Sequence, residues 1–301
     1  MNSTKGIQNI YCRVQYTIAR DLFQELNRIG FPYAVVKGGP LAYYKTGDPT
    51  TRVSGDIDIL IPRQNVGEIK LLLRHMGYTT SYEPDRKEKI LMMASSHQVL
   101  PYSKSRGSFE LQVDVNFDLF LGEFNGKRID IIEFLSDTVW MDIYGCKIRT
   151  LPPLKMLVQL ILHHYKEMNS FFYLTHACPI KKRFFEDVYL LCKRYNQEIS
   201  VESVYEISCR YHILPYVYYV FYYTKEVYND SILDPYLVAL YSFEGESLLN
   251  CYGLTEQERR VWKLDFMERL EQDISDYIQY DMSNSDREKL AMSKRLFGFE
   301  E

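Results

Sequence analysis

Two aspartates separated by one residue are the first groups in this chain that can do chemistry. Asp56 and Asp58 lie in the run D-I-D-I-L-I, which is rich in β-branched residues and ends at Pro62, so we expect a strand there. Side chains alternate between the faces of a strand, so the two carboxylates point the same way, about 7 Å apart, while Ile57 and Ile59 point into the core. Such a pair can share divalent cations such as Mg²⁺.

A pair of glycines lies upstream of these acids. Ala34–Val36 reads as a short strand that runs into Lys37, Gly38 and Gly39. A glycine pair at a strand end lets the backbone approach a phosphate closely. A helix that begins in the segment Leu41–Tyr44 would direct its amino end towards that anion.

A second predicted strand, Phe109–Asn116, has one polar face. Its sequence F-E-L-Q-V-D-V-N alternates apolar and polar residues, the pattern of a half-buried strand. The polar face carries Glu110 and Asp114, which lie beside the first two acids if the strands are neighbours. Asp118 follows the expected end of the strand, and we expect it to be a cap or a surface acid.

These motifs resemble the nucleotidyltransferases of the DNA polymerase beta superfamily, and most of all its bacterial branch of stand-alone, largely uncharacterised nucleotidyltransferase-like proteins. The stretches K-G-G-P-L and R-x-S-G-D-I-D-I-L-I carry the resemblance. It covers residues 31–116 well and the helical remainder loosely. That family combines a Gly-Gly or Gly-Ser turn, a D-x-D strand and a third acidic residue on a later strand.

The resemblance implies that Asp56, Asp58 and Asp114 are the catalytic and metal-binding residues. Asp114 matches the acid of the family's later strand, and Glu110 is the substitute candidate. The implied cofactor is Mg²⁺ (or Mn²⁺), in a pair of ions that serve the attacking oxygen and the triphosphate. Asp114 would bind the catalytic ion and help to take the proton from the acceptor hydroxyl.

The resemblance also implies a nucleotide site, and here the chain departs from the commoner pattern. Gly39 stands where other members carry a serine, and the gap from Gly39 to Asp56 is longer than in the smallest members. Under this reading the nucleotide-binding residues are Lys37, Gly38, Gly39, Arg52 and Ser54. Lys37 and Arg52 are the cationic partners expected for the phosphates, with a solvated surface charge as the alternative.

The implied activity is transfer of a nucleoside monophosphate, AMP first of all, from a nucleoside triphosphate to a hydroxyl acceptor. The acceptor is a small molecule, a peptide or a protein; an RNA acceptor is not favoured, because the formal net charge is −4. Two other hypotheses remain open. One is a catalytically inactive nucleotide-binding regulatory module, and the other is the toxin of a toxin–antitoxin pair.

The elements that position these residues indicate an α+β fold in two domains. The chain has 301 residues, 46% of them hydrophobic and 25% charged, which is enough for two domains with their own cores. Leu151-Pro152-Pro153 breaks the pattern. We therefore expect a nucleotidyltransferase domain at 1–150, with an N-terminal helix and a mixed sheet, and an all-helical domain at 151–301.

The apolar spacing predicts the remaining elements. We expect helices at 7–29 and 65–76, a hairpin of strands at 90–93 and 97–100, and strands within 139–148 joined by a turn at Tyr144-Gly145. Beyond residue 154 we expect helices, among them 201–210, 214–227, 235–243 and 255–280, followed by a charged tail that frays.

Two further groups belong to the helical domain. His163, His164 and Lys166 lie on one predicted helix. Adjacent histidines are not expected to face one metal from the same side of a helix, so a packing or capping role is the preferred interpretation. Lys181-Lys182-Arg183 either binds the acceptor or the triphosphate tail or forms a solvated surface.

The cysteines and the hydropathy pattern indicate a cytoplasmic protein that does not enter membranes. No C-x-x-C pair and no zinc-ligand spacing occurs, which is typical of free thiols in a reducing compartment. The N-terminal residues lack the apolar run of a signal peptide, and the longest apolar-aromatic run is too short to cross a bilayer. The six cysteines are Cys12, Cys146, Cys178, Cys192, Cys209 and Cys251.

Overall fold

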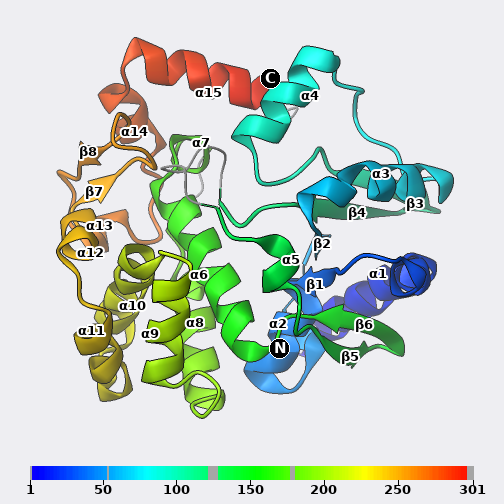
Figure 1. The fold of residues 1–301 in the computed structure, drawn as a ribbon, viewed down its shortest axis with the longest axis horizontal. Helices are drawn as coiled ribbons and strands as arrows, with labels where there is room; N and C mark the ends of the chain where they lie inside the picture. The colour runs from blue at the N-terminus through cyan, green and yellow to red at the C-terminus, as the bar shows by residue number, and fades with distance from the viewer. Residues whose placement is uncertain (1, 53, 121–127, 177–179, 297–301) are drawn as a thin grey trace. The chain divides into compact units, whose positions relative to one another are not determined.

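The computed structural model describes residues 2–52, 54–120, 128–176 and 180–296, and the chain divides into two units (Figure 1). One unit comprises Met1–Leu119 and Ile129–Met156, and the other Phe120–Arg128 and Leu157–Glu301. The class is α+β, as the sequence predicts. The division into independently folding domains at 1–150 and 151–301 stays a proposal.

The first unit is built on a six-stranded mixed sheet in the order β3-β4-β2-β1-β6-β5. β2 runs antiparallel to β1 and parallel to β4, and β1 runs parallel to β6, while β3–β4 and β5–β6 are antiparallel hairpins. The strands are β1 (Ala34–Val36), β2 (Asp56–Leu60), β3 (Tyr102–Arg106), β4 (Phe109–Asn116), β5 (Val139–Ile143) and β6 (Cys146–Thr150).

Short and long helices surround this sheet. The long helix α1 packs against β6 and β4 through a buried apolar stripe that includes Leu22 and Leu26. The thiol of Cys146 on β6 donates a hydrogen bond to the carbonyl oxygen of Tyr16 on α1, at 3.3 Å. The helices of this unit are α1 (Asn2–Arg28), α2 (Gly38–Thr46), α3 (Val66–His75), α4 (Arg86–Ser95) and α5 (Ile131–Phe134), with 3₁₀ turns at Pro49–Thr51 and Arg63–Asn65.

The second unit is mainly helical. α10 lies among α8, α9, α11 and α12, and its tyrosines pack in aromatic contacts, such as Tyr219 against Tyr165 with ring centroids 5.0 Å apart. The helices are α6 (Pro153–Asn169), which begins in the first unit, α7 (Phe171–Leu174), α8 (Lys182–Arg194), α9 (Val201–Arg210), α10 (Leu214–Tyr228), α11 (Asp234–Leu240), α12 (Phe243–Leu248), α13 (Phe266–Arg269), α14 (Ser275–Asp281) and α15 (Asn284–Leu296), with a 3₁₀ turn at Ser231–Leu233.

Two predicted strands of the first unit are wrong. The expected hairpin at 90–100 is instead helix α4, which starts at a capping box formed by Asp85 and Glu88. The segment 97–100 makes a single bridge, between Gln98 and Asn116, and the strand that pairs with β4 is β3. The helix expected to begin within Leu41–Tyr44 is present as α2, but it begins earlier, at Gly38, so both glycines lie in its first turn.

The single helix predicted near the C-terminal end is also wrong. The helix expected at 255–280 is replaced by β8 (Arg260–Val261), α13 and α14, and β8 pairs with β7 (Cys251–Tyr252). The apolar residues of this region pack around Tyr252 and Trp262, whose ring centroids lie 4.3 Å apart. The charged tail contains helix α15, and its expected fraying stays a prediction.

Candidate nucleotidyl-transfer site

The three aspartates predicted to act together lie on two neighbouring parallel strands. Asp58 of β2 is directly opposite Asp114 of β4, and Asp56 is opposite Gln112. Because side chains two residues apart share a face, all three carboxylates lie on the same face of the sheet. β1 pairs with the other edge of β2 and places Val36 opposite Asp58, so Lys37 follows directly beside the acids.

Each carboxylate is held by a polar side chain. The Ser54 hydroxyl donates to Asp56 Oδ1 at 2.7 Å, and Gln112 Nε2 donates to Asp114 Oδ1 at 3.1 Å. Asp58 Oδ1 accepts from two donors, Lys37 Nζ at 2.8 Å and Asn116 Nδ2 at 3.3 Å. These contacts fix the orientation of the acids before any ligand binds.

Burial and mutual repulsion make this a site that favours added positive charge. Asp58 is 4% exposed and Asp114 9% exposed. Burial, and then the charges of Asp58 and Asp56, raise the pKa of Asp114 to about 7, and burial followed by the charge of Asp58 raises the pKa of Asp56. Carboxylate oxygens are the ligands that Mg²⁺ and Mn²⁺ prefer, so the donor set fits a divalent cation.

The three aspartates would have to rotate their side chains to bind one cation together. Among the described residues, three metal-ligating side chains have ligand atoms that all lie within 4.8 Å of one another. They are His163, His164 and Glu167. The aspartates do not form such a group. A cation bound to Asp58 Oδ1 would also compete with the Lys37 ammonium, which lies 2.8 Å from that oxygen.

The glycine bend lies beside the acids. Lys37 and Gly38 both have positive φ angles, 57° and 39°, and a Cβ on Gly38 would lie 3.5 Å from the Cβ of Ser54. The bend therefore brings the first turn of α2 next to the residue that holds Asp56. The N–H groups of a first helical turn have no partner within the helix and favour anions.

The packing of neighbouring side chains leaves no room for a side chain at position 39. A Cβ at this position would lie 2.5 Å from the Tyr16 hydroxyl oxygen and 3.2 Å from Ile143 Cγ2. The backbone of Gly39 also hydrogen-bonds the Tyr16 phenol, whose pKa is raised by burial. A tyrosine hydroxyl from α1 thus occupies the space that a serine side chain at position 39 would need.

The other predicted residues lie further from this cluster. Glu110 is exposed at the far end of β4, about 13 Å along the strand from Asp114. Asp118 is buried rather than at the surface, and its Oδ1 accepts from the Leu119 N–H at 2.8 Å. Arg52 is half-buried and its carbonyl accepts from the Cys12 thiol; its part in nucleotide binding stays a prediction.

Three residues that hold the site were not singled out from the sequence. Gln112 and Asn116 share the polar face of β4 with Asp114, and the strict alternation of that strand is the signal that could have found them. Tyr16 lies 23 residues before Gly39 on α1, and no local pattern links the two. In the helical unit, Lys182 and Arg183 are exposed, and the binding role considered for this cluster is not tested.

The site therefore combines a D-x-D strand of a mixed sheet, a third aspartate directly opposite on a parallel strand, and a glycine bend beside them. The family model described as "Uncharacterised nucleotidyltransferase" matches residues 9–229. The chain belongs to this family, and the superfamily predicted from the sequence is thereby confirmed.

Comparison with other proteins adds little to this assignment. The search of curated proteins finds no match. Among solved structures, the antibiotic-resistance factor ANT(2'')-Ia is 15% identical, with a TM-score of 0.38 over 67% of this chain and 96% of that one. An antigenic nucleotidyltransferase-like protein from Paracoccidioides brasiliensis is 14% identical, with a TM-score of 0.38 over 72% and 97%. We base no conclusion on likenesses this weak.

Proposed function

We propose that this protein is a metal-dependent enzyme that transfers a nucleoside monophosphate, AMP first of all, from a nucleoside triphosphate to a hydroxyl acceptor. The observation that carries the proposal is the register that sets Asp58 opposite Asp114, with Asp56 on the same face. Mg²⁺ or Mn²⁺, held by these three aspartates, would neutralise the triphosphate and lower the pKa of the attacking hydroxyl.

The chain's own residues then have separate tasks. Asp114 accepts the proton of the acceptor hydroxyl, a task for a carboxylate that lies on the same face as Asp56 and Asp58. The acceptor oxygen bonds to the α-phosphorus, the bond from that phosphorus to the β-phosphate oxygen breaks, and pyrophosphate leaves. Lys37 has its ammonium beside Asp58 and interacts with the phosphate oxygens.

The first turn of α2 contributes backbone donors to the phosphates. The Gly38 N–H is the better donor of the two glycines, because Gly39 already hydrogen-bonds Tyr16. Ser54 acts on the nucleotide through Asp56, because its hydroxyl donates a hydrogen bond to Asp56 Oδ1. Arg52 belongs to the proposed site on the strength of the sequence motif.

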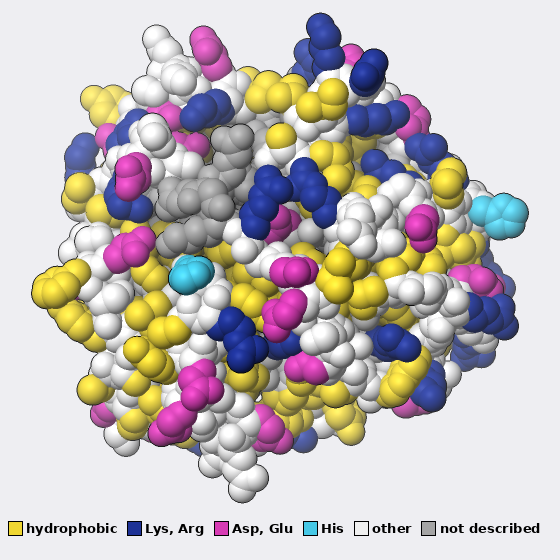
Figure 2. Space-filling model, viewed as in Figure 1, with side chains coloured by type: hydrophobic (Ala, Val, Ile, Leu, Met, Phe, Trp, Pro, Cys, Tyr) yellow, Lys and Arg dark blue, Asp and Glu magenta, His cyan; other side chains and the backbone are white. Residues whose placement is uncertain are grey.

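We favour a small-molecule, peptide or protein acceptor over RNA. The formal net charge is −4, and on the face drawn in Figure 2 basic and acidic side chains are interspersed. A surface built to hold a long nucleic acid concentrates positive charge instead.

We further propose a cytoplasmic location. Cys12, Cys146, Cys192, Cys209 and Cys251 are free thiols, as expected in a reducing compartment; Cys178 lies outside the described residues. Within the described ranges, no helix has both the length and the apolar character needed to cross a membrane.

The test is label transfer from α-³²P nucleotides and Mg²⁺ to components of a cell extract. We expect Asp58→Asn and Asp114→Asn to reduce transfer by at least about 100-fold. Glu110→Gln is the matched control, since it removes an exposed acid from the same face of β4. Comparing the four nucleotides identifies the base, and the labelled product identifies the acceptor. Equal labelling by wild type and Asp58→Asn would overturn the proposal, and so would loss of labelling in Glu110→Gln alone.

A further inference from the structure

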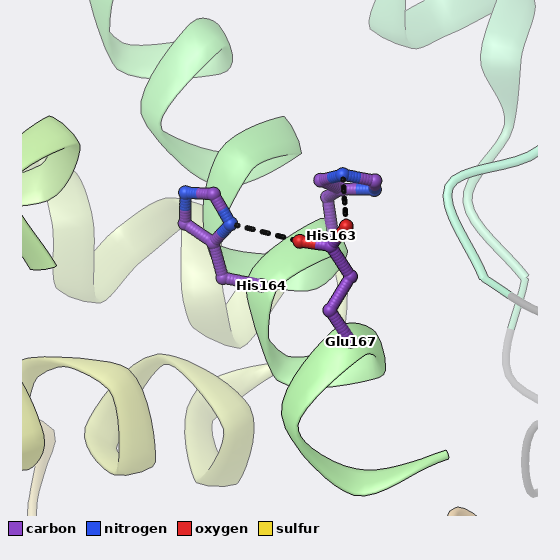
Figure 3. Close-up of side chains that lie close together, drawn as sticks. All are labelled: His163, His164 and Glu167. Atoms are coloured by element: carbon purple, nitrogen blue, oxygen red, sulfur yellow. Dashed lines mark ion pairs between the residues drawn. The ribbon is translucent and has the colours of Figure 1, made fainter. Parts of the chain in front are cut away.

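A second group of metal-ligating side chains lies on α6, within the helical unit. His163 Nε2 is 3.3 Å from Glu167 Oε1, and His164 Nδ1 is 3.6 Å from Glu167 Oε2. Figure 3 shows the Glu167 carboxylate between the two imidazole rings, with one oxygen turned to each. Adjacent histidines were not expected to face one metal, yet the ligand atoms of all three residues lie within 4.8 Å of one another.

His164 is positioned by the neighbouring helix α8. His164 is 1% exposed. Its ring stacks on Phe184, with ring centroids 4.5 Å apart and an interplanar angle of 18°. Its Nε2 faces Asp187 Oδ2 at 3.7 Å. Phe184 and Asp187 are three residues apart on α8 and so share one face of that helix.

The ring nitrogens of His164 are the observation that points to a ligand. Among the described residues, neither nitrogen has a hydrogen-bond partner, although leaving a buried polar group unpaired is unfavourable. A metal on Nδ1 would give that nitrogen a partner. The other nitrogen would then donate to Asp187, the carboxylate–histidine–metal arrangement in which the carboxylate fixes the ring and its tautomer.

We propose that His163, His164 and Glu167 bind one transition-metal ion of the Zn²⁺ type, with Asp187 as the positioning residue behind His164. Two imidazoles and one carboxylate are a zinc donor set that leaves a fourth position for water or a substrate group. Ligand atoms about 2.0–2.1 Å from a tetrahedral ion lie about 3.3–3.4 Å from one another. The spacings of 3.3 and 3.6 Å run from the two histidines to different oxygens of Glu167. All three ligand atoms lie within 4.8 Å of one another, so small side-chain rotations would bring them to this value.

This site is chemically distinct from the aspartate site. The aspartates offer oxygen donors alone, which suit Mg²⁺ or Mn²⁺, whereas imidazole nitrogens favour Zn²⁺ and Co²⁺. The side chains of His163 and Glu167 are 17% and 22% exposed, so an ion can reach them from solvent. The proposal does not depend on the nucleotidyl-transfer activity.

The experiment is Zn²⁺ and Co²⁺ binding to chelator-treated full-length protein, followed by calorimetry, metal analysis and Co²⁺ absorption spectroscopy. We expect one ion per chain and a Co²⁺ spectrum with nitrogen ligation. His163→Ala and Glu167→Gln, which change partly exposed side chains, should weaken binding by more than about 100-fold. Asp187→Asn should weaken it by about 10–100-fold, as expected for a group that orients a metal-binding histidine.

Two controls separate this site from the rest of the chain. His75→Ala removes an exposed histidine elsewhere, and Asp58→Asn removes an acid of the aspartate site; both should bind the ion as wild type does. Zinc found at α6 by anomalous diffraction from wild-type crystals would support the proposal without any variant. The proposal is overturned if wild-type protein binds no ion at micromolar concentration, or if binding survives in both His163→Ala and Glu167→Gln.

Discussion

Asp114 illustrates how a single side chain couples the chemistry of the site to the stability of the protein. Its carboxyl is buried beside two other acids, and its pKa is raised from 3.8 to about 7. A carboxyl with a higher pKa in the folded than in the unfolded state takes up a proton on folding. Its stabilising contribution is therefore complete below about pH 4 and is lost as the pH rises through about 7.

We predict that replacing Asp114 by Asn removes this pH dependence. In the presence of a chelator, the free energy of unfolding of Asp114→Asn should match wild type at pH 4. At pH 8 the variant should exceed it by an amount on the order of 2–4 kcal/mol, since each pKa unit corresponds to about 1.4 kcal/mol. Urea unfolding at a series of pH values measures the difference.

Divalent cations provide the control for this measurement. If Asp114 binds Mg²⁺, adding Mg²⁺ should stabilise wild type more at pH 8 than at pH 5, because protons compete with the metal for the carboxylate. It should leave Asp114→Asn nearly unchanged. A difference between wild type and variant that does not vary with pH would contradict the assigned pKa.

Gly39 permits a prediction at the point where α1 meets α2. Its Cβ position is 2.5 Å from the Tyr16 hydroxyl, so Gly39→Ala should destabilise the protein by about 1–3 kcal/mol. Tyr16→Phe in the same chain should recover part of the loss, because it removes the atom that clashes. Thermal and urea unfolding of both single variants and the double variant measures this coupling.

The matched control for Gly39 is another helical glycine. A Cβ on Gly67 in α3 would meet nothing within 4 Å, and Gly67→Ala should be neutral or stabilising by up to about 1 kcal/mol. Equal effects at positions 39 and 67 would mean that Tyr16 does not determine the choice of glycine.

The sequence predicts the acids of the site but not the residues that hold them. Strand periodicity places Asp56 and Asp58 on one face without knowledge of distant contacts. The choice of Asp114 over Glu110 rests on the resemblance to the family's later strand. The pairing of Lys37 with Asp58 and of Tyr16 with Gly39 depends on how strands and helices meet in space. A single sequence carries no local signal for such contacts.

At the scale of elements, α4 shows how a terminal motif outweighs local composition. Residues 90–93, I-L-M-M, were predicted as a strand because they are apolar, yet they lie in a helix. Asp85 Oδ1 accepts from the Glu88 N–H at 2.8 Å, and Glu88 Oε2 accepts from the Asp85 N–H at 2.9 Å. This D-x-x-E box is a helix-start signal that the sequence itself carries.

We predict that the capping box stabilises α4 by about 1 kcal/mol. Asp85→Ala should lower the stability by that amount and speed amide hydrogen exchange in residues 86–95. Glu88→Gln should change little, because a glutamine side chain can also accept from the cap backbone. The role of the box is refuted if exchange in residues 86–95 is the same in Asp85→Ala and wild type.

The predicted helix at 255–280 fails for a related reason. Its helical spacing is interrupted by separate caps, among them Asp265 and Glu268, which start α13. The aromatic contact between Tyr252 and Trp262 then selects a hairpin between β7 and β8. Apolar spacing alone does not distinguish one long helix from several short elements that pack around a shared aromatic centre.

At the scale of the whole molecule, the chain passes between its two units more than once. Phe120–Arg128 belongs to the helical unit although it lies between segments of the sheet unit. Phe120 is 4% exposed and contacts Tyr216 of α10, with ring centroids 6.2 Å apart. A boundary placed at residue 150 by a break in the sequence pattern separates Phe120 from the unit in which it packs.

We therefore predict that two phenylalanines three residues apart stabilise different units. Phe120→Ala should cost about 3 kcal/mol and increase hydrogen exchange in α10 (Leu214–Tyr228) before it affects the sheet. Phe117→Ala is the matched comparison, because Phe117 is 1% exposed in the sheet unit. It should increase exchange in β2 and β4 first.

Hydrogen exchange with mass spectrometry resolves the two patterns, and fragment 151–301 extends the test. Without Phe120 the fragment should exchange faster in α10 than the full chain does, and a fragment that begins at residue 120 should be protected better. If both phenylalanine variants raised exchange in the same unit, the assignment of Phe120 to the helical unit would be wrong. The expected exchange patterns would show that Phe120 is part of the core of the helical unit. A fragment that begins after residue 150 would then lack part of that core.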